Sequence, residues 1–261
     1  MLKSSKKWSV VAAVGCLIAQ FPGTAPAAGW GTLKGRIIVD GAPTMPPPLA
    51  VAGDPVCIMA KPVNEALVLG KDNALVNAVV YLRVPTGKKV DIHPDYAANM
   101  KVPVVLDNKG CSFHPHITLF QVGRKLVIKN SDPTGHNTNI AVFSFNQTVP
   151  ANGQIEITPP ATAIAALPMP VVCNIHAFMK GHVLSLNHPY AAATGDDGKF
   201  EIKNIPAGPN EFQFWNETGG YLKNVKLKGG TTDARGRAKL TIPAGETLDL
   251  GDIKIPASAL K

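Results

Sequence analysis

Short apolar runs separated by turns recur along the chain from about residue 31. Residues 77–83 contain a continuous apolar run, which is typical of a strand that is covered on both faces. The segment 125–129 is instead expected to be a strand with its polar residues facing outward. A proline-rich loop is expected over 43–73, and further strands are expected at 31–41, 102–106, 117–120, 140–145 and 183–186. The pattern predicts an all-β chain of short strands and many turns.

Residues 1–27 have the layout of a secretory signal peptide. Lysines at the start precede a short apolar stretch at 8–19, and Ala25-Pro26-Ala27 forms a small-residue cleavage site. The apolar stretch is shorter than a membrane-spanning helix, so an uncleaved anchor is the less favoured alternative. We therefore expect an exported protein, periplasmic or secreted, with no stable membrane insertion after the signal is cleaved.

Charge and motifs narrow the class of function. The formal net charge of +8 falls to +5 once the three lysines of the predicted signal peptide are removed, which is mildly basic and favours acidic partner surfaces. A nucleic-acid partner is not expected for an exported chain that lacks a basic-aromatic motif. The sequence holds no G-x-S-x-G, H-E-x-x-H or phosphate-loop pattern, and Asp196 and Asp197 belong to a turn. An enzyme is therefore not expected.

The strongest candidate chemistry is the C-x-x-H-x-x-M pattern of Cys173, His176 and Met179. A thiolate and a thioether are soft ligands, and one Cys with two His and a weak axial Met is the donor set of a blue-copper electron-transfer site. His136, in the segment 130–137, offers the second imidazole. Zinc is the chief rival, but structural zinc sites prefer more Cys or His and no thioether.

The cysteine count bears on the same site. Once the signal peptide is removed, Cys57, Cys111 and Cys173 remain. Exported cysteines usually pair. If Cys57 pairs with Cys111, the leftover thiol is the one in the metal motif.

A second cluster, Cys111-Ser-Phe-His114-Pro-His116, also has metal-ligand spacing. One interpretation is a second copper or zinc site with His114 and His116 as ligands, joined by another of the scattered histidines, His93, His182 or His188. The favoured alternative is the Cys57–Cys111 disulfide, with His114 on the surface and His116 packed beside the first site.

The two donor segments resemble the cupredoxins, the small blue-copper electron carriers. The short metal loop followed by Lys180-Gly181-His182-Val183 is similar to that of amicyanin, with Ala177 where amicyanin has Pro, and the N-x-D…H-N pattern also resembles the family. The resemblance covers residues 100–187. It implies copper as cofactor, the four ligands His136, Cys173, His176 and Met179, and a role for Asn137 in tying the His loop to the Cys loop.

A second resemblance covers 191–208, which is similar to carboxypeptidase regulatory-like, transthyretin-like β-sandwiches. Its Asp197-Gly198 predicts a hairpin turn, and the segment 35–43 resembles the first strand of that family. The expected architecture is a Greek-key cupredoxin sandwich at 98–187, inserted in or next to a transthyretin-like sandwich. The flanking parts are an N-terminal β segment at 28–97 and a C-terminal sandwich at 188–261. The alternative is three separate domains that follow one another along the chain.

These features predict a mononuclear type 1 copper protein that carries single electrons between periplasmic redox partners, such as a cytochrome c or a periplasmic dehydrogenase. Four protein ligands leave no open position for a substrate. The exposed edge of His176, beside Ala177 and Phe178, is the expected exit for the electron. The alternatives are a copper storage or delivery protein, and an envelope interaction module with a vestigial copper site.

Overall fold

The computed structural model describes Met1, residues 29–85 and residues 87–260. Apart from Met1, the predicted signal peptide therefore lies outside the described residues. Strands dominate the described part, whose one α-helix is the six-residue α1 at Pro55–Ala60. The prediction of an all-β fold is confirmed. None of the described helices is long and apolar enough to cross a membrane.

The two ends of the chain build one pair of sheets, which we call the first sandwich. One sheet has the order β15-β1-β21, and the other has the order β14-β4-β16-β17, with β20 paired to β16. Alternate residues of β1 are buried, among them Leu33, Ile37 and Val39, because one face of a strand packs on the core. The bounds are β1 Trp30–Asp40, β4 Val79–Arg83, β14 Ala191–Ala193, β15 Lys199–Pro206, β16 Gly208–Asn216, β17 Gly220–Tyr221, β20 Arg237–Ile242 and β21 Thr247–Pro256.

The residues between β4 and β14 build a second pair of sheets, the inserted sandwich. Its sheets have the orders β10-β9-β12-β13-β7 and β11-β8-β5-β6. The bounds are β5 Val104–Lys109, β6 Ser112–His114, β7 Ile117–Gln121, β8 Leu126–Asn130, β9 His136–Ile140, β10 Phe145–Val149, β11 Gln154–Ile157, β12 Met169–Val172 and β13 Lys180–Leu186. Because β4 and β14 are antiparallel neighbours, the chain leaves and re-enters the first sandwich at adjacent strands. Three separate domains in succession would not allow this pairing, because β1 pairs with β15 and β21, and β4 pairs with β14 and β16.

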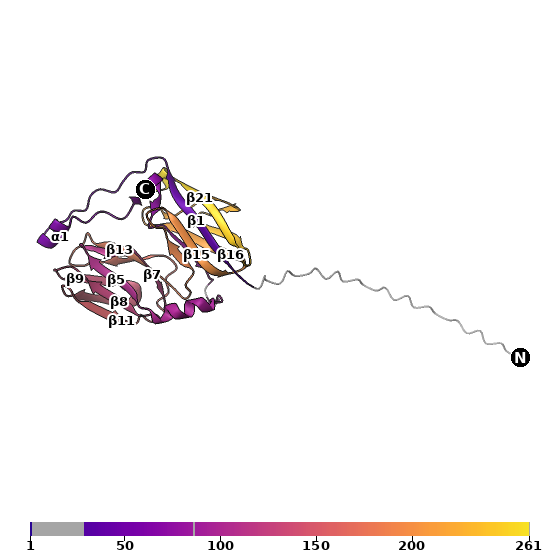
Figure 1. Cartoon of the computed structure of the whole chain (residues 1–261), viewed down its shortest axis with the longest axis horizontal. Coiled ribbons are helices and arrows are strands. Elements are labelled where there is room, and N and C mark those ends of the chain that lie inside the picture. Colours follow the sequence, from indigo (N-terminus) through magenta and orange to yellow (C-terminus); the bar gives the residue numbers. More distant parts are fainter. Residues whose placement is uncertain (2–28, 86, 261) are drawn as a thin grey trace.

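A long arm, residues 41–67, connects β1 to the short strand β2. Figure 1 shows the arm leaving the first sandwich and bringing α1 to the end of the inserted sandwich near β9 and β13. The expected loop contains a helix because Asp54 accepts a hydrogen bond from the backbone N–H of Val56 and Pro55 begins the first turn. The remaining short elements are β2 Val68–Leu69, β3 Leu75–Val76, β18 Lys226–Leu227, β19 Gly230–Thr231 and the 3₁₀ helices Lys71–Asn73, Pro94–Lys101, Ala141–Phe143 and Ala257–Ala259.

The strand β4 lies between two apolar cores. Val80 and Leu82 belong to the core of the first sandwich, whereas Val79 and Tyr81 face an interface core between the sandwiches. We call this interface the seam; its other buried apolar members are Ile117, Leu184, Leu186 and Trp215. All four β4 side chains are at most 2% exposed. The prediction that this strand is covered on both faces is confirmed, and the seam fixes the two sandwiches against each other.

The turn at Asp197-Gly198 differs from the expected hairpin. Gly198 has a φ of +72° and its backbone N–H donates to the carbonyl of Gly195 at 2.8 Å, so the turn is tight. However, β14 pairs with β4 and β15 pairs with β1, so the strands on either side lie in different sheets. Pairing with β1 buries Phe200 and Ile202 in the core of the first sandwich. The hairpin prediction is therefore wrong, and the turn is a corner between two sheets.

His188 lies where the chain re-enters the first sandwich, and its side chain is buried. Its Nδ1 accepts a hydrogen bond from the backbone N–H of Tyr190 at 3.2 Å. Burial lowers the pKa of His188 to about 4, although a hydrogen bond with the backbone of Leu82 opposes the shift. The imidazole is therefore neutral at neutral pH.

This buried imidazole should make the folded state less stable as the pH falls. The unfolded chain protonates the side chain near pH 6.5, whereas the folded chain resists protonation down to about pH 4, so stability is lost between these values. Between pH 7 and pH 5 the wild type should lose about 2 kcal/mol more unfolding free energy than His188→Gln, which keeps a donor and an acceptor but does not titrate. Urea unfolding at several pH values measures this, and equal slopes for the two proteins would contradict it.

Candidate metal centre

The candidate ligands meet at one end of the inserted sandwich. His136 is the first residue of β9, and Cys173 directly follows β12. Because β12 pairs with both β9 and β13, the loop between β12 and β13 is held beside the start of β9. This loop contains His176 and Met179. The sheet register therefore brings the two segments that sequence analysis singled out to the same place.

The side chains of this group are buried, and three of their donor atoms make close pairwise contacts. Nδ1 of His136 lies 2.9 Å from Nδ1 of His176, and Sγ of Cys173 lies 3.8 Å from the same Nδ1 of His176. Met179 is buried in the same core as Cys173, and its backbone N–H donates to the carbonyl of His176 at 2.8 Å. All four side chains are at most 5% exposed. Nδ1 of His176 therefore lies close to both an imidazole nitrogen and a sulfur, which are donor types that soft and borderline metals accept.

The sulfur of Cys173 is placed as a thiolate would be. It accepts hydrogen bonds from the backbone N–H groups of Asn137 and His176, each at 3.3 Å. The side-chain carbonyl of Asn137 also accepts from the backbone N–H of Asn174 at 3.2 Å. Asn137 therefore ties β9 to the metal loop through both its backbone and its side chain, which is the bridging contact that the resemblance implies for it.

The other two cysteines of the described chain form a disulfide, Cys57–Cys111, which links α1 to the start of β6. Their sulfurs lie near the imidazoles but are bonded to each other. Cys173 is therefore the free thiol of the described residues, as the pairing favoured from the sequence would leave it.

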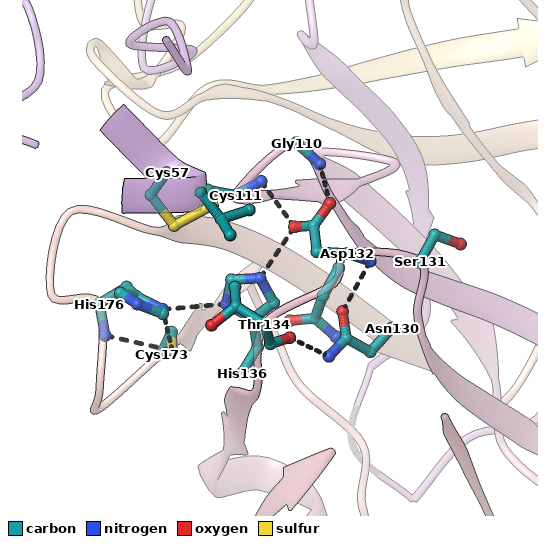
Figure 2. Close-up of polar contacts among 12 residues, drawn as sticks. Cys57, Gly110, Cys111, Asn130, Ser131, Asp132, Thr134, His136, Cys173 and His176 are labelled. Atoms are coloured by element: carbon teal, nitrogen blue, oxygen red, sulfur yellow. Dashed lines mark hydrogen bonds and ion pairs between the residues drawn. A yellow bond between two sulfur atoms is a disulfide. The ribbon is translucent and has the colours of Figure 1, made fainter. Parts of the chain in front are cut away.

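Asp132 orients His136, and sequence analysis gave it no role. Its Oδ2 contacts Nε2 of His136 at 2.8 Å and accepts from the backbone N–H of Cys111 at 2.8 Å, while Oδ1 accepts from Gly110 at 2.6 Å (Figure 2). A carboxylate on Nε2 keeps the proton there and turns the lone pair of Nδ1 inward. Burial lowers the pKa of His136, although Asp132 pulls it upward. The signal was present in the quoted N-x-D…H-N segment, four residues before the histidine.

Asp54, from the arm, contacts the second imidazole. Its Oδ2 lies 3.2 Å from Nε2 of His176 and accepts from the hydroxyl of Thr134 at 2.7 Å. The Thr134 hydrogen bond lowers the pKa of Asp54 below its ordinary value. Each imidazole of the centre therefore has a carboxylate on its outer nitrogen. No local pattern indicated Asp54, because it lies 122 residues from His176 in the chain.

The expectation that one edge of the His176 ring is exposed to solvent is wrong. His176 is 5% exposed, because the arm covers its outer nitrogen with Asp54. The exposed apolar residues of the metal loop are instead Ile175, at 55%, and Ala177, while Phe178 is half-buried. The apolar surface beside the ligands is therefore present, but the imidazole is not part of it.

In the second cluster, Cys111 forms the disulfide and His114 is on the surface, as the favoured alternative expected, and the less favoured grouping of His114 with His116 as ligands is wrong. His114 is exposed at the end of β6, and it belongs to no metal-competent group among the described residues. His116 is buried and joins His182 and Glu217 instead. Burial opposes protonation of His116, but contacts with the carboxylates of Glu217 and Glu65 outweigh it and raise the pKa to about 9.

Comparison with known proteins gives partial matches to copper proteins. No protein-family model and no curated protein matches the chain. A Cu-containing nitrite reductase from Thermus scotoductus SA-01 matches at 22% identity and a TM-score of 0.28, covering 39% of this chain and 24% of that chain. Amicyanin from Paracoccus versutus matches at 17% identity and a TM-score of 0.28, covering 41% of this chain and 96% of that chain. Because these TM-scores are low, the case for a metal centre rests on the donor atoms described above.

Proposed function

We propose that the chain is a mononuclear type 1 copper protein that transfers single electrons. Its ligands are the two imidazoles of His136 and His176, the thiolate of Cys173 and, as a weak axial donor, Met179. The observation that supports this most strongly is that Nδ1 of His176 lies 2.9 Å from Nδ1 of His136 and 3.8 Å from the sulfur of Cys173, which is a free, buried thiol. Copper, when bound there, would supply exchange between Cu(I) and Cu(II).

The residues around the ligands suit such an exchange. Asp132 and Asp54 hold the outer nitrogens of the two imidazoles, and the hydrogen bonds to Cys173 fix the sulfur. Buried apolar side chains of the inserted sandwich surround Cys173 and Met179 and exclude water. A site that is held in this way needs little rearrangement when its charge changes, and hydrogen bonds to the sulfur tune its potential.

The proposed setting is an oxidising compartment outside the cytoplasm. A disulfide between Cys57 and Cys111 fits an exported protein, as does the signal-like segment at 1–27. The proposed partners are redox proteins such as a cytochrome c or a periplasmic dehydrogenase. Ile175 and Ala177 form the docking surface in this proposal, since they are exposed beside the ligands. Brief contact over a small interface is enough for electron transfer. We do not propose an enzyme activity, because four protein ligands fill the site.

The visible absorption and electron-spin spectra of the copper-loaded protein test this proposal. We expect an intense thiolate-to-copper charge-transfer band that disappears on reduction and is absent from Cys173→Ser. The matched control is His114→Asn, which changes an exposed histidine outside the centre and should keep the band. A pale protein with an ordinary square-planar Cu(II) signal would overturn the proposal and favour copper storage or an interaction module.

A further inference from the structure

A second group of potential ligands lies at the seam and shares no residue with the first centre. It consists of side chains from four separate segments, which we call the seam cluster: Glu65, His116, His182 and Glu217. His116 precedes β7 and His182 lies on β13, both in the inserted sandwich. Glu217 follows β16 of the first sandwich, and Glu65 comes from the arm. The cluster therefore joins all three parts of the molecule.

The geometry of the cluster is compact and fixed by the backbone. Nε2 of His116 lies 2.6 Å from Oε2 of Glu217, and Nδ1 of His182 lies 3.5 Å from the same oxygen. One ligand atom from each of these three residues lies within 4.8 Å of the others. The backbone N–H of His182 also donates to the carbonyl of His116 at 2.8 Å. Glu65 approaches from the other side, with Oε2 at 3.6 Å from Nδ1 of His116.

Contacts within the seam cluster leave some of its buried nitrogen atoms without hydrogen-bond partners. The side chain of His116 is 4% exposed and that of His182 is 11% exposed. The Nδ1 atoms of both imidazoles are buried without a hydrogen-bond partner. Two carboxylates face the two imidazoles, and the positive charge of Lys180 also acts on Glu217 and helps to lower its pKa. Buried polar atoms without partners are costly. A cation held by Nε2 of His116, Nδ1 of His182 and Glu217 would give the imidazole of His182 a partner, and Glu65 would then accept a hydrogen bond from Nδ1 of His116.

The donor set indicates which cation fits. Imidazole nitrogen and glutamate oxygen are ligands that Zn²⁺ accepts in tetrahedral sites. Calcium and magnesium prefer oxygen alone, and the cluster has no sulfur for a soft ion. A cleft of about 450 Å³, lined by Glu65, His116 and Glu217, gives an ion a route to the cluster. We propose that the seam cluster binds one Zn²⁺ ion, which ties the arm and the two sandwiches together.

Zinc titration of the full-length mature protein tests this proposal, with metal counted by elemental analysis after gel filtration. The copper-loaded protein should retain one additional zinc per chain, and its charge-transfer band should not change. Glu217→Gln should weaken zinc binding by at least about 100-fold, because loss of a ligand exceeds the effect of losing an outer partner. His114→Asn is the matched control, since that side chain is exposed and outside the cluster, and it should bind zinc as the wild type does.

Three results would overturn the zinc site. They are no zinc beyond the copper even in large excess, zinc that displaces copper mole for mole, and zinc binding that Glu217→Gln leaves unchanged. If Glu217→Gln is poorly folded, His182→Gln replaces it, and zinc should raise the Tm of the wild type but not of that variant. The inference does not depend on the copper proposal, because Cys173→Ser, which lacks the thiol donor, should still bind one zinc. The two proposals can therefore fail separately.

Discussion

A double variant, Cys57→Ser with Cys111→Ser, should unfold with a free energy about 4 kcal/mol below that of the oxidised wild type. The disulfide joins residues that are 54 positions apart. In the chain-entropy account, a loop of that length restricts the unfolded chain by about 4 kcal/mol. Both sulfurs are fully buried, so the serine hydroxyls would also lie in an apolar core. Urea unfolding of the metal-free protein measures the difference.

Chemical reduction of the wild type is the matched control, because it breaks the same bond without a substitution. It should reproduce most of the loss. A loss below about 1 kcal/mol in both cases would mean that the arm is held by its other contacts and that the disulfide adds little. The same double variant should still develop the charge-transfer band, since neither Cys57 nor Cys111 supplies the sulfur donor.

The centre was predictable from the sequence where its geometry is local. Cys173, His176 and Met179 share one loop, so their spacing alone indicates that their side chains can meet. His136 was found because the N-x-D…H-N pattern of the segment 130–137 resembles the cupredoxins. Donor chemistry then limited the choice of metal. Nothing in these inferences required knowledge of the sheet order.

The contacts that come from distant segments were not predictable in the same way. The destination of a proline-rich arm depends on tertiary packing, so neither Asp54 nor the burial of His176 could be deduced from the local pattern. The seam cluster shows the same limit, because His116 and Glu217 are 101 residues apart. His116 was grouped with His114 because they are close in sequence. However, His114 ends β6 with its side chain in solvent, while His116 packs at the seam.

The corner at Gly198 shows a third kind of limit. Asp-Gly correctly indicates a tight turn with a positive φ, and Gly198 provides it. A Cβ at this position would lie 2.5 Å from the carbonyl oxygen of Ile37, so the close approach also requires glycine. What the dipeptide does not specify is whether the strands on either side pair with each other. In this fold β15 pairs with β1 and β14 pairs with β4, and both partners lie far from the turn in the sequence.

Asp132→Asn should weaken copper binding by about 100-fold, at the upper end of the range for an outer partner of a metal ligand. The carboxylate accepts hydrogen bonds from the backbone of Gly110 and Cys111 and holds Nε2 of His136. An amide has only one acceptor oxygen, so its NH₂ group must face one of these donors. If it faces His136, the imidazole moves its proton to Nδ1, and the inward lone pair that would bind copper is lost.

The matched control is Asp107→Asn, which perturbs the same loop without touching an imidazole. Asp107 accepts from the backbone N–H and the hydroxyl of Ser131, next to Asp132. Competition with a copper chelator measures both affinities, and the control should stay within about twofold of the wild type while Asp132→Asn falls. Equal losses would assign the effect to the loop as a whole. A selective loss at Asp132, with the absorption band shifted in the copper that remains, would show that the carboxylate acts through the tautomer of His136.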